Sequence, residues 1–105
     1  MRSFSERVWN LMKRIPCGRV TTYKELAKAL NSKAYRAVGN ACRKNPYAPR
    51  VPCHRVVKSD GAVGGFAGDI VGKSVKRKIA LLKREGVHVQ NGRVVNFEKV
   101  LFKFK

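Results

Sequence analysis

Residues 51–56 read Val-Pro-Cys-His-Arg-Val, and the rest of the chain is organised around this stretch. Pro52 fixes its own φ and pushes the residue before it toward extended geometry, so Cys53 is expected on a rigid turn that leads into a strand. A cysteine reacts as its thiolate, which nearby positive charge favours. His54 and Arg55 follow it directly. The stretch therefore predicts a reactive thiol, and the flanking sequence has to indicate what that thiol attacks.

The composition indicates one domain that binds a polyanion. At 105 residues the chain is long enough for one modest core, and a single domain is expected over residues 1–105. It carries 24 Lys and Arg against 6 Asp and Glu, which gives a formal net charge of +18. Nucleic acid or an anionic membrane surface would suit this charge. Because the basic residues are spread over several predicted elements, nucleic acid is favoured over a merely solvated lysine-rich surface.

Several function classes are disfavoured by what the sequence lacks. No apolar run approaches the roughly 20 residues that cross a bilayer, and the first residues form no signal-peptide apolar region. We therefore expect no membrane partner and an intracellular protein, cytoplasmic or, in a eukaryote, nuclear. The three cysteines show no CxxC spacing, which argues against a disulfide framework and a structural zinc site. No metal and no cofactor are expected.

Three helices are predicted before the cysteine stretch. The first, capped by Ser3 or Ser5 and stopped by Pro16 and Gly18, carries an apolar stripe of Phe4, Val8, Leu11, Met12 and Ile15. The second runs from Tyr23 to Leu30 and opens with a capping box of Thr22 and Glu25. The third covers about residues 34–43 and follows a tight turn. Two short helices joined in this way predict a helix-turn-helix.

The third predicted helix has an unusual surface. Arg36, Asn40 and Arg43 share one face, and Ala37 and Gly39 are small. A glycine inside a helix costs about 1 kcal/mol relative to alanine. Its presence indicates close approach of something large, either a nucleic-acid backbone or a neighbouring helix. The combination of small residues with arginines favours DNA.

The sequence after the cysteine stretch begins with a glycine-rich loop. Five glycines within residues 61–72, around Phe66, either let backbone approach a flat ligand closely or form a flexible surface loop. A helix is predicted over residues 73–84, with the buried stripe Val75, Ile79 and Leu82 and with Lys78 among its basic surface residues. Glu85 ends this helix, where an acid is unfavourable for the helix dipole. It is either an exposed acid or has a tertiary role, such as holding a histidine.

The C-terminal part predicts a hairpin and a short helix. Residues 87–95 alternate in hydrophobicity around Asn91-Gly92, a strong hairpin signal. From residue 96 to residue 105, Phe97, Leu101 and Phe104 follow helical spacing, which predicts a short amphipathic helix. The predicted fold is mainly α: a winged helix-turn-helix-like domain with short strands and a C-terminal β-hairpin wing.

The chain resembles the O6-alkylguanine-DNA alkyltransferases, also called methylated-DNA–protein-cysteine methyltransferases. The motifs that carry the resemblance follow in order over roughly residues 4–88: Arg7-Val8-Trp9, Ile15-Pro16-Cys17-Gly18, Thr22 to Ala27, Arg36-Ala37-Val38-Gly39, Asn45-Pro46, VPCHRVV at 51–57, Gly61 to Gly68, and Leu81 to Gly86. The resemblance implies the family's C-terminal active-site domain alone, without the additional N-terminal domain that full-length members carry.

The family's substrate is a guanine alkylated at O6 in duplex DNA, which is flipped into a pocket before sulfur displaces the alkyl group. The resemblance implies that Cys53 is the nucleophile and that His54, through a bridging water, takes its proton. Glu85 would orient that histidine. Tyr23 would push the flipped nucleotide's phosphate and donate a proton to the guanine, and Arg36 would fill the gap in the stack. Each molecule would act once, and a monomer is expected.

The resemblance also implies roles for further positions. The expected DNA-binding residues are Thr22, Tyr23, Arg36, Ala37, Gly39, Asn40 and Arg43. The expected substrate pocket is lined by Val56, Gly65, Phe66, Ala67 and Gly68. Asn45 and Arg55 are expected in structural roles, Asn45 by tying the helix-turn-helix to the cysteine turn. Two positions depart from the family: Ala67 stands where serine is common, and Phe66 where tyrosine is common.

Three alternatives remain. Non-catalytic alkyltransferase-like proteins share the fold and bind lesions, but they replace the reactive cysteine, which is present here as Cys53. In a plain winged-helix regulator the same cysteine would only pack in the core. A cysteine hydrolase is weaker, because no asparagine or aspartate is specifically placed to complete a triad.

Overall fold

The protein is mainly helical with a few short strands, as the sequence predicted. The computed structural model describes residues 3–47, 50–63 and 73–104. Its helices are α1 (Phe4–Met12), α2 (Tyr23–Ala29), α3 (Tyr35–Arg43), the single 3-10 turn η1 (Cys53–Arg55), α4 (Lys73–Arg84) and α5 (Phe97–Val100). Its strands are β1 (Thr21–Thr22), β2 (Val56–Val57), β3 (Val89–Gln90) and β4 (Arg93–Val94). None of the helices in this part of the chain is both long enough and apolar enough to span a membrane.

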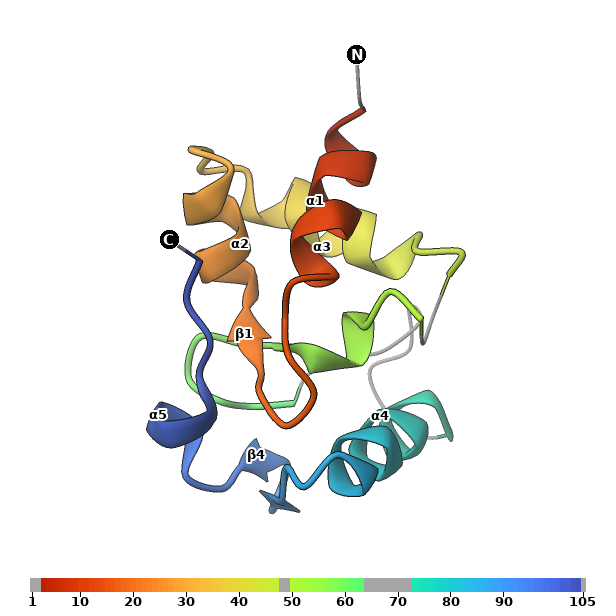
Figure 1. The fold of residues 1–105 in the computed structure, drawn as a ribbon, viewed down its shortest axis with the longest axis vertical. Helices are drawn as coiled ribbons and strands as arrows, with labels where there is room; N and C mark the ends of the chain where they lie inside the picture. The colour runs from red at the N-terminus through yellow and green to blue at the C-terminus, as the bar shows by residue number, and fades with distance from the viewer. Residues whose placement is uncertain (1–2, 48–49, 64–72, 105) are drawn as a thin grey trace.

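Helices α1, α2 and α3 pack together at one end of the molecule, and α4 and the hairpin lie at the other (Figure 1). Ser3 caps helix α1, because its Oγ accepts from the Glu6 amide at 3.2 Å. Thr22 Oγ1 accepts from the Glu25 amide at 3.0 Å and so caps α2. The predicted stripe of α1 extends past the helix itself. Ile15 is 1% exposed but follows the helix end, on a turn.

A parallel strand pair joins the start of α2 to the cysteine stretch. Thr21 pairs with Val56 and Thr22 with Val57. Because β1 directly precedes α2, this pairing holds β2 next to the start of α2. The strand after the cysteine turn was predicted, but its pairing with β1 was not. The cysteine turn consequently lies between the three-helix end and the α4 end (Figure 1).

The predicted C-terminal helix is wrong beyond α5. The chain turns extended at Leu101, which forms a parallel bridge with Val20. Arg19 Nε donates to the Val100 carbonyl at 3.0 Å, and Thr21 Oγ1 donates to the Phe102 carbonyl at 2.8 Å. The helical spacing of these residues therefore does not decide their structure. Pairing with the segment around Val20 gives the backbone its hydrogen bonds, and Phe102 and Phe104 pack, partly buried, against the core.

The predicted hairpin is confirmed. Val89 pairs with Val94 and Gln90 with Arg93 across Asn91 and Gly92, whose φ values are 53° and 75°. Two successive positive φ values are what a two-residue primed turn requires, and Asn-Gly adopts them readily.

The core has two parts, one under the three helices and one between α4 and the hairpin. The first contains Cys53 and Val56, and the second contains Val57 and Leu82. One prediction about α4 is wrong: Lys78 is 0% exposed rather than on the basic surface. Its ammonium finds carbonyl partners inside the protein, which permits the burial.

Candidate functional site

Cys53 opens η1 and is nearly buried, with 7% of the residue exposed. The turn is held by its own backbone, because the Cys53 amide donates to the Val51 carbonyl at 2.9 Å. The Asn45 side chain donates to the same carbonyl at 2.7 Å, which ties the end of α3 to the turn. Burial raises the pKa of the Cys53 thiol, while a hydrogen bond from Asn45 and the charge of Lys78 act in the opposite direction. At neutral pH the resting group is therefore a thiol that needs a base.

His54 supplies a base next to it. The residue is 1% exposed, and its Nε2 lies 3.0 Å from Glu85 Oε2. Burial lowers the pKa of His54, although the bond to Glu85 acts against this. A neutral imidazole beside a carboxylate carries its proton on the nitrogen that faces the carboxylate, and in His54 this nitrogen is Nε2. The other nitrogen, Nδ1, is buried and has no hydrogen-bond partner among the described residues, so its lone pair is available to a proton.

Arg55 holds the Glu85 carboxylate through a bidentate salt bridge. Arg55 Nε donates to Oε1 at 2.8 Å and Nη2 to Oε2 at 2.6 Å, and Nη1 donates to the Ile15 carbonyl at 2.7 Å. Burial raises the pKa of Glu85, but the hydrogen bonds from Arg55 and His54 outweigh it and hold the pKa below its ordinary value. The predicted contact of Glu85 with a histidine is confirmed. Its partner Arg55 explains why an acid is tolerated at the end of α4.

Lys78 is the residue of this site that sequence reasoning missed. Its Nζ donates to the carbonyls of Val56 and Val63, both at 2.7 Å. Burial lowers the pKa of Lys78 to about 8, and Cys53 and Cys42 act to raise it. The available signal was its spacing, because Lys78 lies four residues before the buried Leu82 and three after the half-buried Val75, on one face of α4.

Tyr23 and Thr22 lie at the start of α2. Tyr23 is half-buried and packs against the core cluster that contains Cys53. Burial raises the pKa of Tyr23, with Cys42 and Cys53 acting in the same direction, so the phenol keeps its proton. Thr22 is 4% exposed and its hydroxyl caps α2, which removes that side chain from the expected DNA-binding surface.

The surface of α3 agrees with its predicted pattern. Arg36, Asn40 and Arg43 are exposed, and Ala37 and Gly39 are half-buried. A Cβ added at Gly39 would meet nothing within 4 Å among the described residues. Close packing of α3 against another helix therefore does not account for this glycine in the described part of the chain.

The predicted substrate pocket is described only in part. Val56 is 0% exposed, and its carbonyl accepts from Lys78. The other predicted pocket residues, Gly65, Phe66, Ala67 and Gly68, lie outside the described residues, as does most of the glycine-rich loop. Across the described ranges, no group of three His, Cys, Asp or Glu is placed to hold a metal ion.

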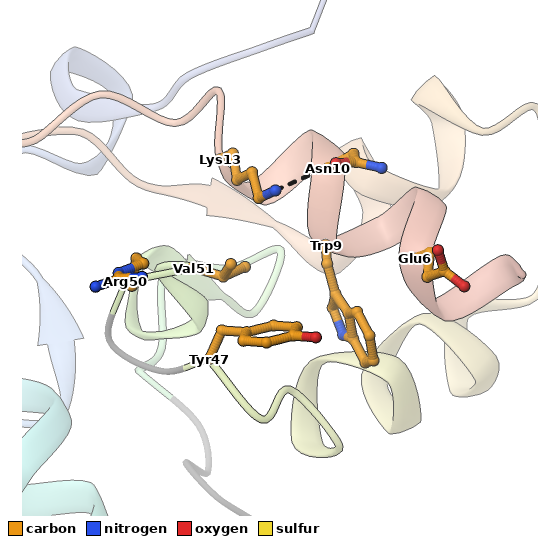
Figure 2. A pocket seen from close by; sticks show the side chains of 7 residues that line it. All are labelled: Glu6, Trp9, Asn10, Lys13, Tyr47, Arg50 and Val51. Carbon is orange, nitrogen blue, oxygen red and sulfur yellow. Dashed lines mark hydrogen bonds between the residues drawn. The ribbon is translucent and has the colours of Figure 1, made fainter. Parts of the chain in front are cut away.

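A separate hollow of about 570 Å³ lies beside the cysteine turn on the α1 side (Figure 2). Trp9 and Tyr47 meet there edge to face with ring centroids 5.9 Å apart, and the Trp9 indole donates to the Ala41 carbonyl at 2.8 Å. The hollow is lined by Glu6, Trp9, Asn10, Lys13, Tyr47, Arg50 and Val51, none of which was a predicted site residue.

The free energy of unfolding is expected to fall as the pH is lowered below about 6.5, which is above the pH at which most carboxylates titrate. Because the pKa of His54 is lowered, the unfolded chain binds a proton at about pH 6.5 that the folded protein does not. Stability that is present above about pH 6.5 is therefore lost as the pH falls. The lowered pKa of Glu85 adds a loss of the same sign below about pH 4.3. Urea unfolding as a function of pH measures this.

The matched control uses the chain's other histidine, His88, which is exposed. His88→Asn should keep the decline below pH 6.5, whereas His54→Asn should remove it. A decline that disappears only with His88→Asn would contradict the assignment.

Most of the chain matches the model of one protein family. The family model described as the DNA-binding domain of 6-O-methylguanine DNA methyltransferase matches residues 3–87. The methylated-DNA–protein-cysteine methyltransferase of Archaeoglobus fulgidus is 47% identical over 88 residues, which are 81% of this chain and 57% of that protein. The protein of the same name from Rattus norvegicus is 46% identical over 87 residues, 81% of this chain and 40% of that protein. The chain thus spans about half the length of these curated relatives.

Two solved structures with DNA have the same fold. Mycobacterium tuberculosis OGT in complex with DNA matches 81% of this chain and 50% of its own at 40% identity, with a TM-score of 0.71. S. pombe Atl1, in complex with damaged DNA containing O6-carboxymethylguanine, matches 99% of this chain and 100% of its own at 28% identity, with a TM-score of 0.82. Together with the match to the family model, these similarities show that the chain belongs to the 6-O-methylguanine DNA methyltransferase family, through that family's DNA-binding domain.

Proposed function

We propose that this chain repairs O6-alkylguanine in duplex DNA by moving the alkyl group to Cys53, once per molecule. In this proposal the chain corresponds to the active-site domain of its longer relatives and works as a monomer without a cofactor. The observation that carries it is that His54, which follows the buried Cys53, contacts Glu85, and that Arg55 holds Glu85 in place. A thiol, a neutral base with a free lone pair and a fixed carboxylate are adjacent in one chain, which is the arrangement that activates a cysteine nucleophile.

The protons and electrons of the proposed alkyl transfer balance with the side chains that are present. The Cys53 proton passes through a water to His54 Nδ1, and Glu85 stabilises the imidazolium that forms. The thiolate attacks the alkyl carbon, a sulfur–carbon bond forms, and the carbon–O6 bond breaks with its electron pair left on oxygen. Tyr23 donates a proton to the guanine and takes one from solvent, to which His54 releases the proton that it received from Cys53. The net change moves one proton from sulfur to guanine and leaves a stable thioether.

Delivery of the base depends on DNA binding by the helix-turn-helix of α2 and α3. The exposed residues Arg36, Asn40 and Arg43 would face the duplex, and the β3–β4 hairpin would act as the wing. Arg36 would occupy the place that the flipped nucleotide leaves. With a net charge of +18, binding should weaken steeply with added salt, because neutralised phosphates release counterions.

Gly39→Ala tests this orientation of α3. The free protein should gain about 1 kcal/mol of stability, since alanine favours the helix and no described residue would contact the new methyl group. The affinity for duplex DNA should fall, because the methyl group would stand between α3 and the DNA. Urea unfolding and fluorescence anisotropy measure the two effects. A destabilised free protein with unchanged affinity would instead indicate that Gly39 faces the interior.

The experiment that tests the function is mass spectrometry after incubation with a duplex that holds one O6-methylguanine. One methyl group per protein molecule is expected on the peptide that contains Cys53, with none on the peptides of Cys17 and Cys42. The same duplex with an ordinary guanine is the control. Absence of any methyl group on Cys53 in folded protein that binds the duplex would overturn the proposal.

A second candidate is binding to the lesion without transfer. It is favoured by the end-to-end match with Atl1, whose solved complex contains damaged DNA. The experiment above separates the two, because a lesion-binding protein would prefer the O6-methylguanine duplex and yet acquire no methyl group. If the chain prefers neither duplex, a plain winged-helix regulator is the better description.

A further inference from the structure

Helix α4 carries a group of exposed basic side chains that the proposed reaction does not use. Its described exposed residues are Lys76, Arg77, Ala80, Lys83 and Arg84. These positions recur at i, i+1, i+4, i+7 and i+8, so they form one face of the helix, opposite the buried Lys78 and Leu82. The four cations among them, at positions 76, 77, 83 and 84, are called the α4 basic face below.

The charges of the α4 basic face are not neutralised within the described part of the chain. None of its four side chains forms an ion pair with another described residue. The sequence of α4 contains no acid. Glu85, which directly follows the helix, is engaged by Arg55 and His54 instead. The four positive charges are therefore free to meet an anion from outside the protein.

We propose that the α4 basic face binds the phosphate backbone of a second DNA segment, separate from the segment that α3 contacts. Lys76 and Arg84 lie about 12 Å apart along the helix axis, at 1.5 Å per residue. A row of cations of this length lies beside several phosphates, because each DNA strand carries one about every 3.4 Å. This inference rests on the DNA-binding part of the proposed function.

The composition of the face favours a phosphate backbone over other polyanionic surfaces. Its one uncharged exposed residue is Ala80, and no aromatic or large apolar side chain is exposed on the described part of α4. A membrane-surface helix needs such side chains to enter the lipid. Single-stranded nucleic acid is held largely by bases that stack on aromatic rings, which this face lacks. Contacts from Lys and Arg alone suit the backbone of a duplex.

The position of α4 indicates that this duplex differs from the one at α3. The cysteine turn η1 lies between the three-helix end and α4 (Figure 1). The inner face of α4 points toward that turn, because Lys78 donates to the Val56 carbonyl directly after it. The α4 basic face, on the opposite side of the helix, therefore points away from η1. A duplex that delivers a base from α3 to Cys53 would not lie against it, since DNA is stiff over about 150 base pairs.

The test measures whether one protein joins two duplexes. Undamaged duplexes of about 12 base pairs, close in length to the 39 Å longest dimension of the protein, carry either a donor or an acceptor fluorophore. Energy transfer between them measures the bridged complex. Fluorescence anisotropy of one labelled duplex measures the affinity for a single segment. Both are followed as salt is added, and circular dichroism verifies folding.

The variants separate the α4 basic face from the overall charge of the protein. The α4 variant carries four glutamines, which favour helix: Lys76→Gln, Arg77→Gln, Lys83→Gln and Arg84→Gln. The matched control removes the same charge from exposed basic residues outside α3, α4 and the cysteine turn: Arg7→Gln, Lys13→Gln, Lys99→Gln and Lys103→Gln. Two half variants, one with the first two α4 substitutions and one with the last two, keep the test decisive if the fourfold variant does not fold.

The parent protein should bridge the two duplexes, and the α4 variant should form at least about tenfold less of the bridged complex. The matched control should stay within about threefold of the parent. Each half variant should lower the log–log salt slope of bridging by about two, because roughly 0.9 is lost with each phosphate contact. The affinity of the α4 variant for a single duplex should match that of the matched control within about threefold.

Three results would overturn the inference. If the matched control loses bridging as strongly as the α4 variant, net charge alone is responsible. If the α4 variant still bridges, another surface or a second copy of the protein joins the duplexes. If the parent binds one duplex but never two, an acidic protein is a better partner for the face. Because these duplexes carry no alkyl group, none of these results depends on methyl transfer to Cys53, which is decided separately by mass spectrometry.

Discussion

Cys53→Ser is expected to reduce alkyl transfer below detection while duplex affinity stays within about twofold of the parent. The oxygen of serine is a far weaker acid than sulfur, so His54 would have no thiolate to generate. Because the replaced side chain is nearly buried within η1, the surface of α3 should remain as it is. Methyl transfer is read by mass spectrometry and binding by fluorescence anisotropy.

The matched control is Cys42→Ser. Cys42 is also a buried free thiol and also lies in the core beneath the helices, but it packs against Met12 rather than beside the histidine. This variant should keep transfer close to that of the parent, with a modest loss of stability. If Cys42→Ser abolished transfer and Cys53→Ser did not, the nucleophile would be assigned to the wrong cysteine.

Glu85→Gln is expected to affect stability and transfer together. The change leaves Arg55 without its charged partner and removes the carboxylate that accepts from His54. Hydrogen bonds to charged groups contribute about 1.5–3 kcal/mol, so a loss of about 2–3 kcal/mol of unfolding free energy is expected. Transfer should slow by about a hundredfold, because the imidazolium that forms at His54 is no longer stabilised.

Glu98→Gln is the control for that variant, since Glu98 is an exposed acid on α5. Its effect on stability should stay within about 0.5 kcal/mol. Urea unfolding and single-turnover kinetics measure both variants. A Glu85→Gln protein with normal transfer would show that orientation of His54 by the carboxylate is dispensable.

Local signals predicted much of the fold. Ser3 and Thr22 cap the helices that their sequence context indicated, and Asn91-Gly92 turns the hairpin. These features depend on residues that are close in the sequence, so the sequence pattern is sufficient to predict them. The C-terminal residues show where prediction from local sequence fails. Leu101 has helical spacing to Phe97, but it forms a bridge with Val20, and only the folded chain brings that partner into reach.

The site divides in the same way. The sequence by itself determined that Cys53 and His54 are adjacent on a rigid turn and that Glu85 needed an explanation. Only the tertiary structure decided that Glu85 reaches His54, that Arg55 holds it, and that Lys78 enters the core with its ammonium on two carbonyls. The physical reason is that periodicity in the sequence indicates which face of a helix is buried. It does not indicate which polar groups of other segments that face contacts. A basic side chain on a buried stripe is therefore assigned to the surface until the partners that make its burial tolerable are known.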